Sequence, residues 1–389
     1  MSFIHTGRFM LREARDLPMD PVAVVGGGIV GASVASHLAR RSIPVTLFER
    51  DALGGGTTSK SLAMFVWHQS RPEERQHRLR ERAWETYRPL IEDDRIGFER
   101  IGTLDVADSA GELDALRDAR DRLREFGARA ELVGGEALAE FGVAPDEVAG
   151  ALYTPEDGYL DPAEIVQYFV DRARSAGASV ETSTEVTDVV VEDGAVAAVE
   201  TPDGRIAASA VVNAAGPWAP QVNDLVDVSL PLRHNFGPVL VLQQDADVDL
   251  PFVELPDGHY FREEGRQQAF AGKFGAPYED ADVVDPTHAH SIDNEFYLDV
   301  EERVARLLPG LDGVELVNEW VGLRTITPDG RPFVGETDCE GYYVACGMNG
   351  LGVTLAPEIG RLVATAIDDD GRPRRELAEY LSPGRAISQ

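Results

Sequence analysis

The sequence predicts an α/β fold, with a doubly wound parallel sheet in one domain and a mixed sheet in a second, smaller domain. Residues 22–49 read as a strand, a glycine-rich turn, a helix and a second strand. Amphipathic helical patterns then alternate with short apolar runs, which is typical of α/β chains. The length of 389 residues corresponds to two or three domains of about 150 residues each.

The N-terminal unit has the clearest elements. Residues 22–25 (VAVV) form a short apolar strand, and residues 26–31 (GGGIVG) form the turn. A helical stripe of apolar side chains continues to Arg41, and residues 45–49 (VTLFE) form the next strand. This is a βαβ unit, in which the two strands are expected to run parallel.

The later elements follow from the same kinds of pattern. Residues 54–64 lack apolar periodicity, so we expect a loop or the start of a helix there. Helices are expected around residues 79–90 and 113–126, and a third begins at Asp161–Pro162, where a capping residue precedes proline. Residues 178–213 predict a β-meander. The remaining expected elements are strands at residues 239–243, 260–262, 269–274 and 342–346, and helices at residues 301–308 and from about residue 357.

The charge balance excludes one class of partner. Asp and Glu number 68 against 36 Lys and Arg, the formal net charge is −32, and Lys60 and Lys273 are the only lysines. Such a surface repels phosphates, so we expect no nucleic-acid partner. Because salt screens repulsion between like charges, we expect this acidic, lysine-poor chain in the cytoplasm of a halophilic organism.

Metal sites and membrane spans are not expected. Cys339 and Cys346 are too few for a disulfide framework or a zinc site, and the eight histidines are scattered without metal-ligand spacing. No run of 18 apolar residues predicts a membrane span. Residues 1–20 lack the apolar segment of a secretory signal.

Gly26-x-Gly28-x-x-Gly31 matches the dinucleotide fingerprint of Rossmann-type sheets. The three glycines allow a tight turn, close approach of a pyrophosphate, and packing of helix on strand. The positive N-terminal end of the helix would face the phosphates. Glu49 ends the second strand, where a carboxylate accepts hydrogen bonds from both ribose hydroxyls and would repel the 2′-phosphate of NADP. These residues predict an FAD or NAD site without distinguishing the two.

Five further segments indicate one family. In chain order they are Gly55–Met64, Asp157–Pro162, Val212–Ala219, Trp320–Gly330 and Gly347–Pro357. With the fingerprint, they make the chain from Pro21 to Asp368 resemble the FAD-dependent amine and amino-acid oxidoreductases of the D-amino-acid oxidase superfamily. That group includes glycine oxidase, sarcosine oxidase, dimethylglycine dehydrogenase and D-amino-acid dehydrogenase. The resemblance implies that the cofactor is FAD.

The resemblance also implies which residues contact FAD. The first of the five segments would lie against the phosphates and the isoalloxazine, the third would close over the adenine side, and the fifth would lie at the pyrimidine edge. A helix N-terminus after the fifth would stabilise negative charge on reduced flavin. The implied cofactor-binding residues are Gly26, Gly28, Ile29, Val30, Gly31, Glu49, Arg50, Thr57, Thr58, Ser59, Ser61, Leu62, Ala63, Met64, Val186, Ala214, Ala215, Gly216, Trp218, Asn349, Gly350, Leu351, Gly352, Val353 and Thr354.

Arg324 and Tyr260 are implied for the substrate. Arg324 matches the arginine that holds the substrate carboxylate in glycine oxidase-like members, and a bidentate pair would fix the substrate Cα–H over flavin N5. The alternative is that Arg324 pairs with a structural acid such as Glu319 or Glu336. Tyr260 matches an aromatic hydroxyl near the substrate, and the alternative is a tyrosine of the core.

The chain departs from its relatives at several positions. Lys60 stands nearest to a histidine that attaches FAD in dimethylglycine-dehydrogenase-like enzymes, and Gly322 falls where monomeric sarcosine oxidase uses a cysteine. FAD should therefore be bound non-covalently. Thr354 replaces a substrate-binding lysine of sarcosine oxidase, and Phe270 matches its oxygen-activating lysine, with Lys273 three residues away. These differences put N-methylglycine as substrate, and rapid use of oxygen, in doubt.

The resemblance implies oxidation of a small amine or amino acid by hydride transfer from the Cα–H to flavin N5, giving an imine. O2 or an electron-transfer partner would re-oxidise the flavin. The alternatives are an FAD-dependent 2-hydroxy-acid dehydrogenase and a non-catalytic flavin-bearing subunit of a larger complex. We expect the FAD-binding domain to comprise residues 20–84, 147–228 and 318–384, and the substrate domain to comprise residues 85–146 and 229–317.

Overall fold

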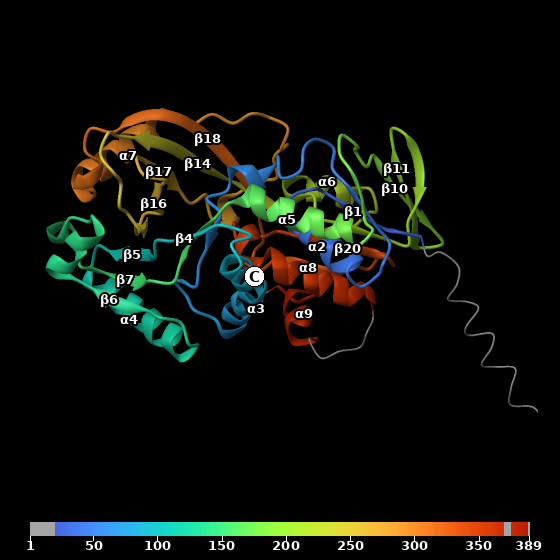
Figure 1. Cartoon of the computed structure of the whole chain (residues 1–389), viewed down its shortest axis with the longest axis horizontal. Coiled ribbons are helices and arrows are strands. Elements are labelled where there is room, and N and C mark those ends of the chain that lie inside the picture. Colours follow the sequence, from blue (N-terminus) through green and yellow to red (C-terminus); the bar gives the residue numbers. More distant parts are fainter. Residues whose placement is uncertain (1–19, 369–374, 388–389) are drawn as a thin grey trace, which may run out of the picture.

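Two large sheets organise the molecule, for which a computed structural model describes residues 20–368 and 375–387 (Figure 1). The first has six strands, in the order β19-β20-β13-β1-β2-β9. All neighbours pair in parallel except β19, which is an antiparallel edge strand. The strands are β1 (Val22–Val25), β2 (Val45–Phe48), β9 (Ser179–Glu181), β13 (Ala210–Asn213), β19 (Phe333–Glu336) and β20 (Tyr342–Cys346).

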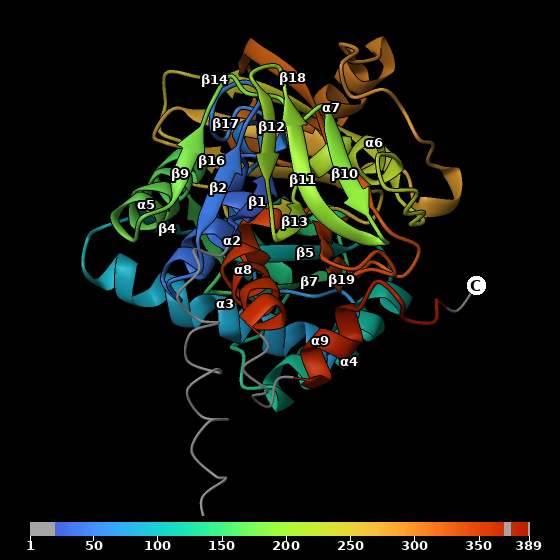
Figure 2. The same cartoon turned by 90° about the vertical axis from the view of Figure 1, so that its right-hand side faces the viewer.

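The six-stranded sheet is covered on both faces. Val24 and Leu47 belong to the apolar cluster shared with the helices, whereas Val25 and Phe48 belong to the cluster on the opposite face. The helical layer consists of α2 (Ile29–Ala39), α3 (Glu74–Glu92), α5 (Pro162–Ser175), α8 (Gly352–Asp368) and α9 (Arg375–Leu381). The opposite layer consists of the three-stranded sheet of β10 (Asp188–Glu192), β11 (Ala195–Thr201) and β12 (Gly204–Ala207), with α6 (Ala219–Asp224) (Figure 2). Burial on both faces explains why β1 and β20 are apolar throughout.

The second large sheet is mixed and has eight strands, in the order β18-β14-β17-β16-β15-β5-β7-β6. Its strands are β5 (Thr103–Ala107), β6 (Glu131–Val133), β7 (Gly150–Thr154), β14 (Arg233–Gln243), β15 (Phe252–Glu254), β16 (His259–Glu264), β17 (Gln268–Lys273) and β18 (Glu315–Ile326). Helix α7 (Asn294–Leu307) packs on one face, and α4 (Ala110–Glu125) packs near β5 and β7 on the other. A separate three-stranded sheet has the order β3-β8-β4. Its strands are β3 (Met64–Phe65), β8 (Gly158–Leu160) and β4 (Phe98–Arg100).

The alternation along the mixed sheet decides which side chains face the site. Leu104, Val253 and Phe261 point into the cluster under α7. Because side chains alternate along a strand, their neighbours Glu254 and Tyr260 point to the opposite face. That face is turned toward the six-stranded sheet.

The structure confirms the α/β class and the βαβ unit, and it corrects some element boundaries. Residues 178–213 do not form one meander, because β9 and β13 pair in parallel with β2 and β1 and only β10–β12 form hairpins. Helix α7 begins at Asn294 rather than near residue 301, because the Asp293 carboxylate caps it by accepting from Glu295 N at 3.1 Å. The expected division into domain segments remains a prediction.

Helix α8 begins at Gly352, five residues before its expected start at Pro357. Proline lacks the N–H that would donate to the carbonyl of Val353, four residues back. The Tyr87 hydroxyl of α3 donates to that carbonyl instead, with 2.6 Å between the oxygens, and the tyrosine is fully buried. The helix therefore continues through the proline.

Replacing Tyr87 with phenylalanine should lower the free energy of unfolding by about 1–3 kcal/mol, because the Val353 carbonyl would be left unsatisfied in the core. Thermal unfolding followed by circular dichroism measures the effect. An unchanged midpoint would show that another group satisfies this carbonyl.

No helix within residues 20–368 and 375–387 combines the length and the hydropathy needed to cross a bilayer.

Candidate active site

A cavity of about 750 Å³ opens at the carboxyl ends of β1, β2, β13 and β20. Ligands of open parallel sheets bind at this edge. The residues that line the cavity extend from the turn before α2 to Arg324 on β18, so both large sheets contribute to its wall. The sequence-predicted fingerprint and the predicted substrate residue therefore share one cavity.

The turn between β1 and α2 brings backbone close to the cavity. Gly26 has φ +108°, a conformation that favours glycine. A Cβ atom on Gly31 would lie 1.9 Å from the Gly26 carbonyl oxygen, so only glycine lets the helix pack this closely. Gly28, the N-cap, has no side chain to cap the helix, and the first turn contains no acidic residue. The positive end of α2 is thus available to an anionic ligand.

Glu49 is fixed beside this turn at the end of β2. Its Oε2 accepts from Gly27 N at 2.7 Å, and its Oε1 accepts from Asp51 N at 2.9 Å. The guanidinium of Arg50 lies 4.0 Å from the Trp218 ring centroid on the other wall. A carboxylate and a flat cation–aromatic pair suit the ribose and the base of a dinucleotide.

The single turn Thr57–Lys60 joins the phosphate end of the cavity to β18. Thr58 Oγ1 accepts from Ile29 N in the first turn of α2, at 3.2 Å. The Thr57 hydroxyl donates to the carbonyl of Leu323, at 2.9 Å, which is the residue before Arg324. The loop therefore fixes the position of β18, which carries Arg324, relative to the turn before α2.

Arg324 lies at the end of the cavity near the mixed sheet. A Cβ atom on Gly237 would lie 2.7 Å from its terminal nitrogen, and one on Gly350 would lie 3.5 Å from its Cδ. The Phe274 ring centroid is 5.5 Å from its guanidinium carbon. Small residues thus leave room for the side chain between β14 and the loop before α8.

The two acids considered as structural partners of Arg324 bond elsewhere. The Glu319 carboxylate accepts from the Tyr297 hydroxyl at 2.8 Å. The Glu336 carboxylate accepts from Gly341 N at 3.0 Å. This geometry favours a ligand role for Arg324.

Tyr260 lies beside Arg324 and is fully buried. Within the described parts of the chain, its hydroxyl makes no hydrogen bond of good geometry. Its ring contacts Phe252 and Phe274, with centroids 5.5 and 5.0 Å away, and Gly272 leaves space for it. Burial raises the pKa of the Tyr260 hydroxyl although the nearby Arg324 charge favours the phenolate, so the hydroxyl remains a donor. A buried hydroxyl donor next to a guanidinium suits a carboxylate ligand.

Most of the predicted cofactor residues line the cavity: Gly26, Gly28, Ile29, Val30, Glu49, Arg50, Thr57, Thr58, Ser61, Val186, Ala214, Ala215, Gly216, Trp218, Gly350, Gly352 and Val353. The others lie behind this lining: Gly31, Ser59, Leu62, Ala63, Met64, Asn349, Leu351 and Thr354. Asn349 donates to the Gly347 carbonyl at 2.6 Å and accepts from Thr327 N at 2.9 Å. Thr354 donates to the Met64 carbonyl at 2.9 Å. These residues hold the loops that form the wall, and a direct contact with the cofactor remains a prediction for them.

The structure also shows the surroundings of the positions at which the sequence departs from the relatives that it resembles. Lys60 Nζ donates to the Val321 carbonyl at 3.4 Å, next to Gly322, so neither an imidazole nor a thiol is offered there. Phe270 is in contact with Trp320, whereas Lys273 Nζ approaches Asp299 of α7 at 3.9 Å. Lys273 therefore points to the face away from the cavity.

Arg262 is a residue that sequence reasoning missed. Its buried guanidinium donates to the Leu62 carbonyl at 3.1 Å and stacks between the Tyr159 and Phe270 rings, at 4.1 and 4.7 Å. It connects the mixed sheet to the cofactor loop. No local pattern indicates this, because an arginine on a strand is usually solvated.

The fold and the site define a dinucleotide-dependent oxidoreductase, in which the fingerprint turn and Arg324 line one cavity. Residues 21–366 match the family described as FAD dependent oxidoreductase. The chain belongs to this family, and its cofactor is FAD. The cavity fits this cofactor, because the glycine turn admits a pyrophosphate and the first turn of α2 contains no acidic residue.

Known relatives match along the whole described fold. Glycine oxidase of Geobacillus kaustophilus (strain HTA426) is 30% identical over 374 residues, which cover 93% of this chain and 95% of that protein. The crystal structure of L-proline dehydrogenase from P. horikoshii has a TM-score of 0.84 at 26% identity, covering 94% of this chain and 98% of that one. Mitochondrial sarcosine dehydrogenase of Mus musculus is 27% identical over 92% of this chain, but the match spans 40% of its own length.

Replacing Glu49 with glutamine should weaken FAD binding by roughly 10- to 100-fold, because the amide is uncharged and offers one accepting oxygen where the carboxylate offers two. Glutamine keeps the shape of the side chain and can still accept from Gly27 N. Titration of apoprotein with FAD, followed by flavin fluorescence, measures the affinity. An unchanged Kd would place the ribose away from Glu49.

Proposed function

We propose that the protein oxidises a small amine or amino acid at its CH–NH or CH–NH2 group. The observation that carries the proposal is the Arg324 guanidinium at one end of the FAD cavity, with the buried Tyr260 hydroxyl beside it. The names of the relatives support it, since glycine, proline and sarcosine each carry a carboxylate next to the carbon that bears the amine.

The residues of the chain bind and orient the substrate. Arg324 would hold the carboxylate in a bidentate pair, and Tyr260 would donate to one of its oxygens. The rings of Phe252 and Phe274 pack against the Tyr260 ring and would hold its hydroxyl beside Arg324. When bound, FAD supplies the two-electron acceptor to which the Cα–H hydride passes, and the substrate leaves as an imine. O2 or an electron-transfer partner takes the electrons afterwards.

The test is an anaerobic titration of the holoenzyme with matched amino acids, amines and 2-hydroxy acids. Loss of flavin absorbance near ~450 nm reports substrate oxidation. Reduction by amines or amino acids supports the proposal. Reduction by 2-hydroxy acids alone would make the protein a hydroxy-acid dehydrogenase, and no reduction by either class would indicate a non-catalytic flavoprotein.

Replacing Tyr260 with phenylalanine should lower kcat/KM for a carboxylate substrate by about tenfold, the effect of one hydrogen bond to a charged group. The effect should be absent for amines without a carboxylate. Equal losses for both kinds of substrate would show that the hydroxyl does not contact the carboxylate.

A further inference from the structure

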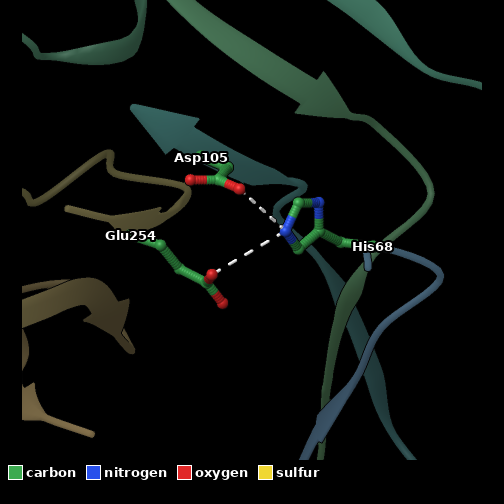
Figure 3. A group of neighbouring side chains, drawn as sticks. All are labelled: His68, Asp105 and Glu254. Carbon is green, nitrogen blue, oxygen red and sulfur yellow. Dashed lines mark ion pairs between the residues drawn. The ribbon is translucent and has the colours of Figure 1, made fainter. Parts of the chain in front are cut away.

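His68, Asp105 and Glu254 form a buried cluster apart from the cavity (Figure 3). They come from distant segments: the loop after β3, strand β5 and the end of β15. Their side chains are 4%, 13% and 16% exposed. One ligand atom of each residue lies within 4.8 Å of those of the other two.

The strand register places two carboxylates side by side. Glu254 lies opposite Asp105 in the parallel pair of β15 and β5, so both side chains point to the same face. Like charges on neighbouring strands repel, and in a buried position they need a positive partner. His68 is the residue that approaches both (Figure 3).

The backbone at His68 is held in place. The buried Asp157 carboxylate accepts from Trp67 N at 2.7 Å and from His68 N at 3.3 Å. Asp157 is itself fixed by the Thr154 hydroxyl, at 2.8 Å. The imidazole is therefore aimed at the two carboxylates by a rigid support (Figure 3).

The imidazole is not satisfied by the carboxylates alone. Its Nε2 lies 3.1 Å from Asp105 Oδ2 and 3.8 Å from Glu254 Oε2. Both ring nitrogens are shielded from solvent, and within residues 20–368 and 375–387 the second one, Nδ1, has no hydrogen-bond partner. One imidazole beside two buried carboxylates leaves the cluster short of positive charge, which favours an additional cation.

We propose that this cluster binds one divalent transition-metal ion of the zinc class, through His68 Nε2 and one oxygen each of Asp105 and Glu254. Bonds of about 2.0–2.2 Å in a tetrahedral site place donor atoms about 3.4 Å apart. The separations of 3.1 and 3.8 Å bracket this value. When the ion takes the place of the proton on His68 Nε2, two carboxylates and a neutral imidazole neutralise its double charge. The mixed nitrogen and oxygen donors favour zinc over magnesium or calcium, which prefer oxygen alone.

A bound ion would link the segment after β3, which carries His68, to strands β5 and β15 of the mixed sheet. His68 follows strand β3, which continues from the loop at Thr57–Lys60. Glu254 lies opposite Tyr260 in the pair of β15 and β16. The ion is therefore one strand away from the predicted substrate hydroxyl, and its binding can be measured independently of the reaction.

The first test is calorimetric titration of chelator-treated holoenzyme with zinc chloride. We expect one saturable site per chain, which excess magnesium does not displace. Replacing His68 or Glu254 with glutamine should weaken zinc binding at least tenfold. His288→Gln is the matched control, because this exposed histidine lies 3.1 Å from the Asp285 carboxylate, and it should leave the affinity unchanged. Absence of a saturable site, or one that persists in both cluster variants, overturns the proposal.

A second measurement needs no variant and remains decisive if the variants fail to fold. X-ray absorption of the zinc-loaded wild-type holoenzyme should show nitrogen and oxygen neighbours that include one imidazole. A sulfur neighbour would place the ion at Cys339 or Cys346 and would overturn the assignment to His68.

Discussion

Replacing Arg324 with methionine should lower kcat/KM for amino-acid substrates by roughly 100- to 1,000-fold. On the proposed function, the substitution would remove two charge-assisted hydrogen bonds to the substrate carboxylate, together about 3–4 kcal/mol of binding that orients the Cα–H. FAD binding should be retained, because the fingerprint turn is untouched. The rate of flavin reduction at low substrate concentration, measured anaerobically, is the readout.

Arg88→Met is the control for loss of a positive charge, because Arg88 lies exposed on α3 and its side chain is 61% accessible. It should leave the reduction rate unchanged. If Arg324→Met reduces as fast as the wild type at low substrate concentration, another group holds the carboxylate.

Replacing Gly31 with alanine should reduce the FAD content of the purified protein more than tenfold. The new methyl group would lie 1.9 Å from the Gly26 carbonyl, so α2 must move away from the turn that receives the pyrophosphate. Gly111→Ala in α4 is the matched control, since no atom lies within 4 Å of its added Cβ. The ratio of flavin to protein absorbance measures both variants.

A yellow, fully loaded Gly31→Ala protein would contradict the close packing of α2 on β1. Loss of flavin in both variants would instead point to general destabilisation. The comparison of the two variants therefore distinguishes a local effect on the FAD-binding turn from a loss of stability of the whole protein.

The sequence predicted what depends on local geometry. The turn from Gly26 to Gly31 and the acid at Glu49 lie within one βαβ unit, so their spacing alone places them together. The capped helix start at Asp161 was predicted for the same reason, and its carboxylate accepts from Ala163 N at 2.7 Å. The resemblance to a family added Arg324, which the structure brings to the same cavity.

Features that depend on long-range pairing were not predictable from one sequence. The start of α8 depends on Tyr87, a residue of another helix that replaces the donor missing at Pro357. The cluster of His68, Asp105 and Glu254 depends on the pairing of β5 with β15, which no spacing in the sequence reveals. The sequence shows no spacing typical of a metal site, because His68, Asp105 and Glu254 come from three distant segments.

The most direct test of this account is the flavin content of the purified chain and its response to added FAD. The account predicts a yellow protein with one FAD per polypeptide, which unfolds at a higher temperature when FAD is in excess. A colourless protein that neither binds added FAD nor gains thermal stability from it would contradict the account.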